Sequence, residues 1–568
     1  MSRFINRKSI ISIFVALTLV TTFAGGVLLR SASPAQAASP KAVSGKNPIC
    51  SRLGQGVQAS SGAQMYCFGV QSNGATHPAT TSSFGSNVNA ANTKEDITPS
   101  GTRAYGQSEV SIAGIGSYVV EGWNDSTGFF APCPSPMYKE ELTGFGFSAN
   151  GGQSFTDLGG LPNDCTTGFK YEGDPSVETW KAGGATYFYV ISLYVNGSTG
   201  QSDLAMDACK ATGTGTSASL SCSMPIIVAT GGSGDFLDKD FLSIDPKHGR
   251  LYTSYTRFGA FGSPTFNGQI ELAVCDIGTP SGGIGPAGGT AGAPVCFPGA
   301  SPTPYFVVAP GDANCENEGA YPAVNVKTGD VYVAWEFNWA TNYQVAACAS
   351  QPTQNRVAYV PYSCLTLTPV SPCTTTPLTV GVNIVSMDLA FISGYNRFPA
   401  NDFPRIAVSN TYGTVSIVWN DARAHPLGDI FLQSFNLVSL SPVKANPVRI
   451  NPDTGGLHFL PALRKADDGG NLSVSYYQRD KANTDLTNVD ALIDLNPRTA
   501  TFGSHVRVTT GPSSWLNVSS DIIPNFGDYT DNYMRSTQNA PYTDDVLYVA
   551  WSDGRLGVPQ PFEAHGMS

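Results

Sequence analysis

The sequence predicts an all-β fold, a β-propeller of six or seven four-stranded sheets with seven favoured, because one phrase recurs about seven times. In each copy an extended segment, often opened by Pro, is followed by a turn with Gly and a β-rich run that ends in Trp or Tyr. With 61 Gly and 39 Pro residues and few helix-like stretches, the composition also favours many short strands joined by turns. The clearest copies are 321–335, 403–419 and 460–477, and weaker copies begin near Glu109, Asp174, Asp238 and Gly527.

Each unit has room for four strands, and in the fifth unit 429–434 is the expected third strand. A unit of this kind cannot bury its apolar face alone, so it must pack against its neighbours. Four-stranded units that repeat radially protect their edges, whereas the repeats of a solenoid, the competing architecture, are usually shorter and end in visible caps. The last unit ends soon after Trp551, too early for a fourth strand. We therefore expect part of residues 83–107 to supply that strand and close the ring.

The chain begins with a predicted signal peptide, residues 1–37. Three basic residues precede an apolar run at 10–29, and 35–37 is a small-residue cleavage site. The run is long for a signal peptide, so an uncleaved anchor is the alternative. We expect an exported chain, secreted or associated with the cell envelope, that does not insert into a membrane after cleavage. Residues 38–107, rich in Ser, Ala and Gly, are expected to be a loop-rich lead-in, and 108–568 the propeller.

Twelve cysteines in an exported chain predict disulfides. Cys209, Cys275 and Cys348 each end an expected third strand and are each followed by a loop and another Cys. We therefore expect three hairpins clipped at equivalent places in successive units. The expected pairs are Cys50–Cys67, Cys133–Cys165, Cys209–Cys222, Cys275–Cys296, Cys348–Cys364 and Cys315–Cys373, and the alternative for the last two is Cys315–Cys348 with Cys364–Cys373.

The charge excludes several classes of function. Only 13% of residues are charged and the net charge is −11, which argues against a nucleic-acid or anionic-membrane partner. The chain has no His-Glu-x-x-His, Gly-x-Ser-x-Gly, phosphate-loop or dinucleotide motif. None of these motifs therefore indicates a cofactor, and the sequence does not indicate the oligomeric state.

In the first unit, 148–155 reads Ser-Ala-Asn-Gly-Gly-Gln-Ser-Phe. This resembles the Asp-box of sialidase-like (BNR-repeat) propellers, Ser-x-Asp-x-Gly-x-x-Trp, with Asn150 for Asp and Phe155 for Trp. In that family the box is a turn between the third and fourth strands of a sheet. The resemblance implies a sialidase-like propeller directed at glycans. Segments 174–177, 238–241 and 527–529 also look like those of secreted bacterial members of the family.

The catalytic set of sialidases is not recognised. Those enzymes have an early Arg-Ile-Pro motif, two further arginines that grip the substrate carboxylate, a Tyr–Glu pair and an Asp. Here the nearest string is Phe-Pro-Arg-Ile at 403–406, in the fifth unit, and only Arg103 lies near the expected early place. The resemblance therefore concerns the scaffold.

Acidic residues precede most expected first strands, with His458 in that place in the sixth unit. If the first strands line a central channel, these side chains gather at one mouth and raise one another's pKa, which suits a general acid. Oxygen ligands gathered in this way also suit Ca²⁺. The structural alternative is that they cap turns between sheets. The candidate catalytic residues are Asp528, Tyr529, Glu318 and Asp240. The candidate Ca²⁺ ligands are Asp174, Asp238 and Asp402. Glu109 is the remaining acidic residue ahead of a first strand.

Arginines and aromatic residues near the strand ends are candidates for substrate binding. Two units end in Trp-x-Asp-x-Arg, at 419–423 and 551–555, and a structural brace is the alternative explanation of that recurrence. Trp335-Glu336 sets a carboxylate beside an aromatic ring, which suits sugar stacking, with a core edge as the alternative. The candidates are Arg405, Arg423, Arg479, Arg555, Trp335 and Glu336.

Two functions remain open. The first is a noncatalytic propeller that binds glycans or cell-surface proteins, slightly preferred because no complete catalytic set is visible. It predicts exposed aromatic side chains. The alternative is a glycoside hydrolase, exo-sialidase-like, that acts at the channel mouth, which predicts two catalytic carboxyl groups at about 5 Å or about 6.5–9.5 Å.

Overall fold

A computed structural model covers the chain, and 1–39 and 40–568 form separate units, of which only the second contains described residues. The predicted signal peptide lies outside the described part. No helix within that part is long and apolar enough to span a membrane. The described residues are 47–53, 59–68, 84–94, 96, 104–130, 141–260, 262–278, 288–312, 314–338, 348, 350–365, 376–387, 392–396, 402–465, 470–534 and 546–567.

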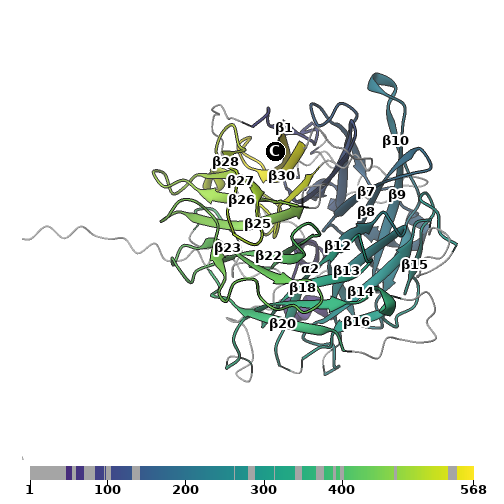
Figure 1. The fold of residues 1–568 in the computed structure, drawn as a ribbon. Coiled ribbons are helices and arrows are strands. Elements are labelled where there is room, and N and C mark those ends of the chain that lie inside the picture. The colour runs from purple at the N-terminus through teal and green to yellow at the C-terminus, as the bar shows by residue number, and fades with distance from the viewer. Residues whose placement is uncertain are drawn as a thin grey trace, which may run out of the picture. The chain divides into compact units, whose positions relative to one another are not determined.

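Seven antiparallel sheets follow one another in chain order (Figure 1). Their first strands contact one another in sequence, and the last contacts the first again, so the sheets close into a seven-bladed β-propeller. This confirms the predicted fold with seven sheets, and the closed ring is incompatible with a solenoid.

The first three sheets hold fifteen strands, because the second has six and the third five. Sheet one is β2 (Gln107–Ile115), β3 (Tyr118–Asp125), β4 (Thr143–Ser148) and β5 (Thr156–Gly160). Sheet two is β6 (Phe169–Tyr171), β7 (Ser176–Ala182), β8 (Ala185–Asn196), β9 (Ser202–Thr212), β10 (Ser219–Cys222) and β11 (Ile226–Thr230). Sheet three is β12 (Phe236–Asp245), β13 (Arg250–Phe258), β14 (Gln269–Asp276), β15 (Val295–Phe297) and β16 (Phe306–Ala309).

The other four sheets have four strands each. Sheet four is β17 (Asn317–Val324), β18 (Val331–Phe337), β19 (Gln354–Val360) and β20 (Leu378–Asn383). Sheet five is β21 (Arg405–Ser409), β22 (Thr414–Asp421), β23 (Asp429–Asn436) and β24 (Val448–Arg449). Sheet six is β25 (Leu457–Lys465), β26 (Leu472–Arg479), β27 (Thr487–Leu495) and β28 (Ser504–Arg507). Sheet seven is β29 (Asp531–Met534), β30 (Val546–Asp553), β31 (Gln560–Met567) and β1 (Val88–Asn89).

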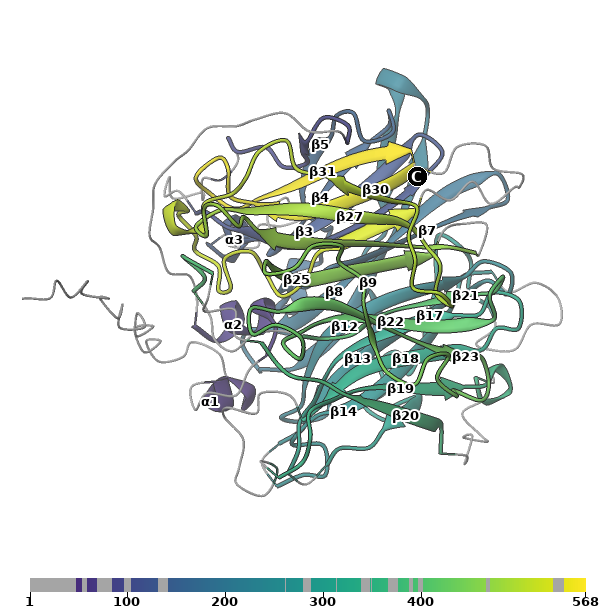
Figure 2. The ribbon, with the colours of Figure 1, turned by 60° about the vertical axis from the view of Figure 1, so that its left-hand side comes forward.

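Helices are few and short. The α-helices are α1 (Ile49–Leu53), α2 (Ser61–Phe68) and α3 (Ser126–Phe130), and the 3₁₀ turns are η1 (Cys165–Thr167), η2 (Gly215–Ser217), η4 (Tyr362–Cys364) and η6 (Trp515–Asn517). The first two helices stand in the segment expected to be loop-rich. Figure 2 shows them at one end of the strands.

The ring is closed by a strand from the N-terminal side of the propeller. Within β1, Val88 pairs with Glu563 and Asn89 with Phe562 of β31. The Gly85 amide donates to the His565 carbonyl at 3.1 Å. The prediction that part of 83–107 supplies the missing fourth strand is therefore confirmed.

Asp96 lies at this closure with 2% of its surface exposed. Its carboxylate accepts hydrogen bonds from Gln107 Nε2 (3.0 Å) and Gln560 Nε2 (3.1 Å). Burial raises the pKa of Asp96 to about 8, and the nearby Asp125 carboxylate adds to the rise.

This predicts a pH dependence of the stability. The folded state holds the Asp96 proton more tightly than the unfolded chain does. The contribution of this proton to the free energy of unfolding is therefore complete below about pH 4 and is lost as the pH rises toward 8. In urea titrations, the free energy of unfolding of Asp96→Asn should fall less between pH 5 and pH 8 than that of wild type, by about 3–4 kcal/mol. The exposed Asp494→Asn is the matched control. Parallel pH profiles for Asp96→Asn and wild type would refute the assignment.

Three predicted disulfides are present: Cys50–Cys67, Cys209–Cys222 and Cys275–Cys296. The last two join a third strand to the next strand, as expected for clipped hairpins.

The expected Cys348–Cys364 pair is wrong, because Cys348 bonds Cys315, as in the alternative pairing. The third strand of sheet four is β19, not the run before Cys348. Cys315 and Cys348 each precede a strand, β17 and β19, and these two strands run in the same direction on either side of β18. Their starts therefore lie at the same end of the sheet. Cys165 and Cys364 are also disulfide-bonded, whereas Cys133 and Cys373 lie outside the described residues.

The segment 148–155 forms the turn between β4 and β5, third and fourth strands of their sheet. Asn150 Oδ1 accepts the Ser154 amide at 3.1 Å, and Ser148 Oγ accepts the Gly152 amide at 3.0 Å. Gly152 has φ 88°, which favours glycine.

Four of the first strands have a bulge at one end, and these bulges help to position the candidate site. In β2, β12, β17 and β25 the pairing skips two residues, and a residue with positive φ occupies each gap. A bulge re-aims the side chains that it displaces. These residues with positive φ are Glu109, Lys239, Gly319 and Leu460.

Candidate functional site

The bulges bring six carboxylates around one ammonium group at one end of the central strands. Lys239 Nζ lies 2.6 Å from Asp528 Oδ2, 3.6 Å from Glu109 Oε1 and 3.7 Å from Asp174 Oδ2. None of the seven residues is more than 3% exposed. The acidic residues of this ring cluster, as we call it, are Glu109, Asp174, Asp238, Asp240, Glu318 and Asp528.

The gathering of acidic residues at one mouth was predicted, but Lys239 was missed. Its signal in the sequence is its place between Asp238 and Asp240, since a lone Lys between two buried Asp residues needs their charge. Burial lowers the pKa of the ammonium, but Asp528, Glu109 and Asp174 more than offset this and raise its pKa well above the usual value. Lys239 is therefore charged.

Asn124, from β3, links adjacent parts of the cluster. Its Nδ2 donates to Glu109 Oε2 at 3.0 Å, and its Oδ1 accepts the Asp174 amide at 2.5 Å. The Asp528 amide donates to Glu109 Oε1 at 2.9 Å. These bonds fix Glu109 and Asp174 beside Lys239.

Asp240 and Glu318 differ from the other members. Neither oxygen of either carboxyl group accepts a hydrogen bond of ordinary geometry. Burial raises both pKa values well above the usual range; the charge of Asp174 adds to the rise for Asp240, and that of Asp238 for Glu318.

The predicted Ca²⁺ set is not assembled. Over the part of the chain that the structure describes, no group of three or more His, Cys, Asp or Glu side chains is arranged to hold a metal ion. Asp174 and Asp238 face the Lys239 ammonium, which supplies the positive charge expected of a cation. Asp402 instead lies near Glu336, whose pKa is raised by burial, then by Asp402 and Glu318.

Arg405 contacts a second set of buried residues on or next to the first strands. It donates to Asp531 Oδ1 (3.0 Å), the Tyr321 hydroxyl (2.6 Å) and the Thr530 carbonyl (3.0 Å). Asp531 Oδ2 also accepts the Ser111 hydroxyl at 2.8 Å. Arg405 therefore ties four first strands together, and Asp531, its partner, was missed in the sequence.

Tyr529 is a neutral phenol in the channel wall. Its hydroxyl donates to the Pro175 carbonyl at 3.1 Å, and burial, then the charges of Asp174 and Glu109, raise its pKa well above the usual value. An ionised nucleophile is not available there in this arrangement.

The repeated Trp-x-Asp-x-Arg phrase is a local brace, which favours the structural alternative. In sheet five, Asp421 Oδ2 accepts both the Trp419 indole N–H (2.9 Å) and the Arg423 guanidinium (2.6 Å). In sheet seven, Asp553 Oδ2 accepts Trp551 (2.7 Å) and Arg555 (2.6 Å) in the same way. The motif thus ties the end of a second strand to the following loop.

Trp335 and Arg479 are not members of the ring cluster. Trp335 is 1% exposed and donates its indole N–H to Asn317 Oδ1 at 2.9 Å, so its ring faces are covered. Burial lowers the pKa of Arg479, and Asp485 opposes the change.

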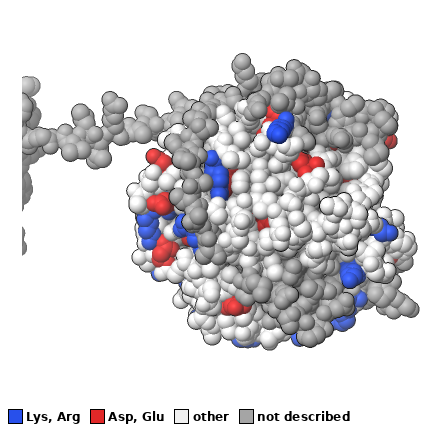
Figure 3. Space-filling view, turned by 90° about the horizontal axis from the view of Figure 1, so that it is seen from above, with Lys and Arg blue, Asp and Glu red and all other residues white. Residues whose placement is uncertain are grey.

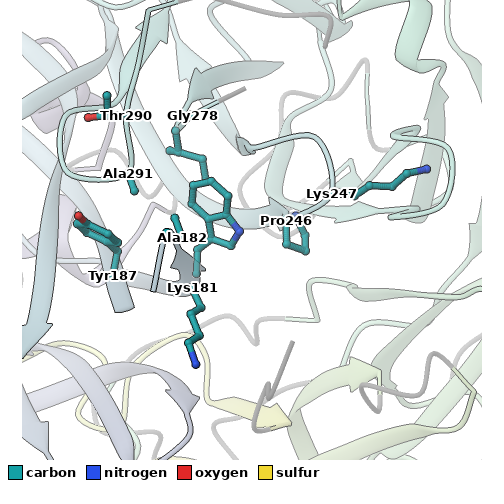
Figure 4. A pocket seen from close by; sticks show the side chains of 11 residues that line it. Lys181, Ala182, Tyr187, Pro246, Lys247, Gly278, Thr290 and Ala291 are labelled. Carbon is teal, nitrogen blue, oxygen red and sulfur yellow. The ribbon is translucent and has the colours of Figure 1, made fainter. Parts of the chain in front are cut away.

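An open cavity of about 710 Å³ lies at the other end of β7, between sheets two and three (Figure 4). Trp180 and Tyr187 supply aromatic rings, while Ala182, Ile277 and Ala291 add apolar surface. Lys181 and Lys247 also line this aromatic cavity, and in Figure 4 their side chains extend in different directions. Its residues come from three separate turns, so no local pattern in the sequence could indicate it.

Charge is sparse on the surface as well. On the face seen in Figure 3, Lys, Arg, Asp and Glu side chains are scattered among uncharged ones, and no continuous basic patch is seen there.

No protein-family model matches the chain, and no curated protein matches it. Solved structures that are similar include the GH93 α-L-arabinofuranosidase of Fusarium graminearum with arabinobiose (9% identity, 86% of this chain, 98% of that chain, TM-score 0.38). Others are Trypanosoma rangeli sialidase with the inhibitor DANA (10%, 86%, 75%, 0.36) and the GH43_1 enzyme from Xanthomonas citri with xylose (14%, 59%, 90%, 0.29). At these values the likeness is one of general architecture, and any function has to be inferred from the sites above.

Proposed function

We propose that this chain is an exported carbohydrate-binding propeller that holds a neutral glycan in the aromatic cavity. The observation that carries the proposal is the open space beside Trp180 and Tyr187. Aromatic rings present flat apolar faces on which the C–H groups of a sugar stack, and the Tyr187 hydroxyl adds a polar contact. The volume of about 710 Å³ lies within the ~300–1,000 Å³ typical of small-molecule sites.

The lining also indicates the charge of the ligand. Among the described residues, no Arg lines the cavity, and its charged lining residues are Lys181 and Lys247. A sugar carboxylate, such as that of a sialic acid, would be left without the paired donors that a guanidinium provides. A neutral hexose or pentose glycan therefore fits better than an acidic one.

Tyr187→Ala is expected to weaken glycan binding about tenfold, or about 1.4 kcal/mol, because it removes one stacking ring. Tyr187 is chosen because Trp180 belongs to a buried apolar core and its loss would disturb folding. A glycan array should first identify the ligand, and calorimetry should then compare the variant with wild type. Tyr118→Ala, a half-buried Tyr at the corresponding hairpin of sheet one, is the matched control. Failure to bind any neutral glycan, or equal affinities, would refute the proposal.

The second candidate is a glycoside hydrolase at the ring cluster. It is favoured by Asp240 and Glu318, which are buried, accept no hydrogen bond of ordinary geometry and have a raised pKa, as a general acid requires. Turnover of a panel of aryl-glycosides, sialosides included, would be measured for wild type, Glu318→Gln and Asp528→Asn. Turnover that is lost in these variants would establish this activity. No turnover on any substrate would leave the binding function alone.

A further inference from the structure

The two helices of the N-terminal segment form one disulfide-linked unit, which we call the helical cap (residues 47–53 and 59–68). Cys50 of α1 is bonded to Cys67 of α2. Its apolar side chains, including Ile49 and Tyr66, belong to the buried core formed by sheets two and three. Because the bond ties the helices together, the cap is expected to dock and leave as a unit.

Polar contacts fix the cap over several sheets. Asn47 Nδ2 donates to the carbonyls of Gly200 (2.8 Å) and Asp235 (2.7 Å). Arg52 forms an ion pair with Glu316 at 3.2 Å and lies over the Phe266 ring at 4.0 Å. The cap therefore contacts the segments between sheets two, three and four, at the end of the strands where the ring cluster lies.

The N-terminus of α2 is bonded directly to the ring cluster. The Ser60 amide donates to Asp238 Oδ2 at 2.9 Å, and the Gly62 amide donates to Asp174 Oδ1 at 3.0 Å. Ser60 Oγ accepts the Ala63 amide at 3.0 Å and so caps the helix. The first amides of a helix point away from it unpaired, and they favour negative charge.

The cluster keeps a need for donors beyond those that the cap supplies. Six carboxyl groups face a single ammonium, and Asp240 and Glu318 are fully buried with no hydrogen bond of ordinary geometry. A buried polar group without a partner is costly, so a ligand that offers N–H or O–H groups and a positive charge would be stabilised here. The two backbone N–H groups of the cap, from Ser60 and Gly62, are donors of the same kind.

We infer that the ring cluster is a second ligand site, for a cationic sugar with a free amino group, and that the helical cap keeps it closed. An ammonium group presents three donors and one charge to carboxylates that are acceptors, while sugar hydroxyl groups satisfy the rest. Binding must displace the Ser60 and Gly62 amides. It also releases protons from the carboxyl groups to the buffer, because a second cation lowers their pKa. The site is separate from the aromatic cavity and does not depend on its function.

Gly62→Ala opens the cap without changing the cluster. A Cβ atom at Gly62 would lie 2.8 Å from Asp174 Oδ1 and closer still to the Glu172 carbonyl oxygen, so the variant cannot keep the Gly62 contact. Gly197→Ala is the matched control, because a Cβ there meets nothing within 4 Å. Hydrogen exchange of the peptide that spans 59–68 would report whether the cap is docked.

The probes are glucosamine oligosaccharides and their N-acetylated counterparts, titrated by calorimetry in buffers of different ionisation enthalpy. We expect Gly62→Ala to lose protection at 59–68 and to bind the free-amine oligomer at least tenfold more tightly than wild type or Gly197→Ala. Binding should release protons, and the N-acetylated oligomer should not bind. Adding Asp238→Asn to Gly62→Ala should weaken the binding.

Three outcomes would overturn the inference: an unprotected cap with no gain in binding, equal binding of the N-acetylated oligomer, or wild type binding as tightly as the variant. If Gly62→Ala does not fold, Arg52→Ala, which removes the ion pair with Glu316, serves the same purpose. Its result is then judged by the same protection and binding criteria.

Discussion

Lys239→Met is expected to destabilise the folded protein by about 3–5 kcal/mol at pH 8, the usual cost of removing one partner of a buried ion pair. Lys239 is fully buried, and its ammonium lies within 4 Å of Asp528, Glu109 and Asp174. Met fills a similar volume but carries no charge, so the loss is electrostatic. The carboxyl groups must then either stay charged without a counter-ion or take up protons.

The pH dependence distinguishes this cause from a packing defect. Taking up a proton costs about 1.4 kcal/mol for each pH unit above the pKa of the unfolded chain, so the loss should shrink by about 4 kcal/mol between pH 8 and pH 5 if one carboxyl group takes up a proton. Urea titrations at both pH values would measure it, with the exposed Lys210→Met as the control. Adding Asp528→Asn should recover part of the loss at pH 8. A loss independent of pH would refute the electrostatic explanation.

The architecture could be predicted because every unit repeats the same pattern of apolar residues, and each must bury its apolar face against its neighbours. The runs that end in Trp335, Trp419 and Trp551 became second strands, and six of the acidic residues at the first strands meet at one end. The missing fourth strand of the last unit, which ends soon after Trp551, was enough to predict the closing strand. These features depend on local patterns that recur, so one sequence carries them several times.

The errors arose where partners are brought together only by the fold. The run before Cys348 has the composition of a strand, but β19 begins at Gln354, and this changed the disulfide pairing. The ammonium group at the centre of the ring cluster belongs to Lys239, which lies between Asp238 and Asp240 in the sequence. The carboxylates, considered without that ammonium group, predict Ca²⁺ as their counter-ion. The aromatic cavity and the helical cap combine residues that are distant in the sequence, and no spacing rule connects them.

Replacing residues 84–91 by an equally long Gly/Ser segment is expected to lower the free energy of unfolding by more than about 5 kcal/mol. Phe84 is buried at 8% exposure against sheet seven, and loss of a buried Phe side chain alone costs about 3–5 kcal/mol. A Gly-rich segment also forms a strand poorly, so the backbone hydrogen bonds from Gly85 and Ala90 to the carbonyls of His565 and Pro561 are weakened, by up to about 1 kcal/mol each.

The size of this effect follows from ring closure. Without β1, the edge of β31 is unpaired, and the contacts of β29 and β30 with β2 must hold the seventh sheet to the first. An equally long replacement at the exposed hairpin tip 212–219 is the matched control and should change the stability little. Denaturant titrations followed by tryptophan fluorescence would compare the two. If both replacements shift the midpoint equally, closure by β1 does not hold the ring together, and the contacts between first strands must suffice.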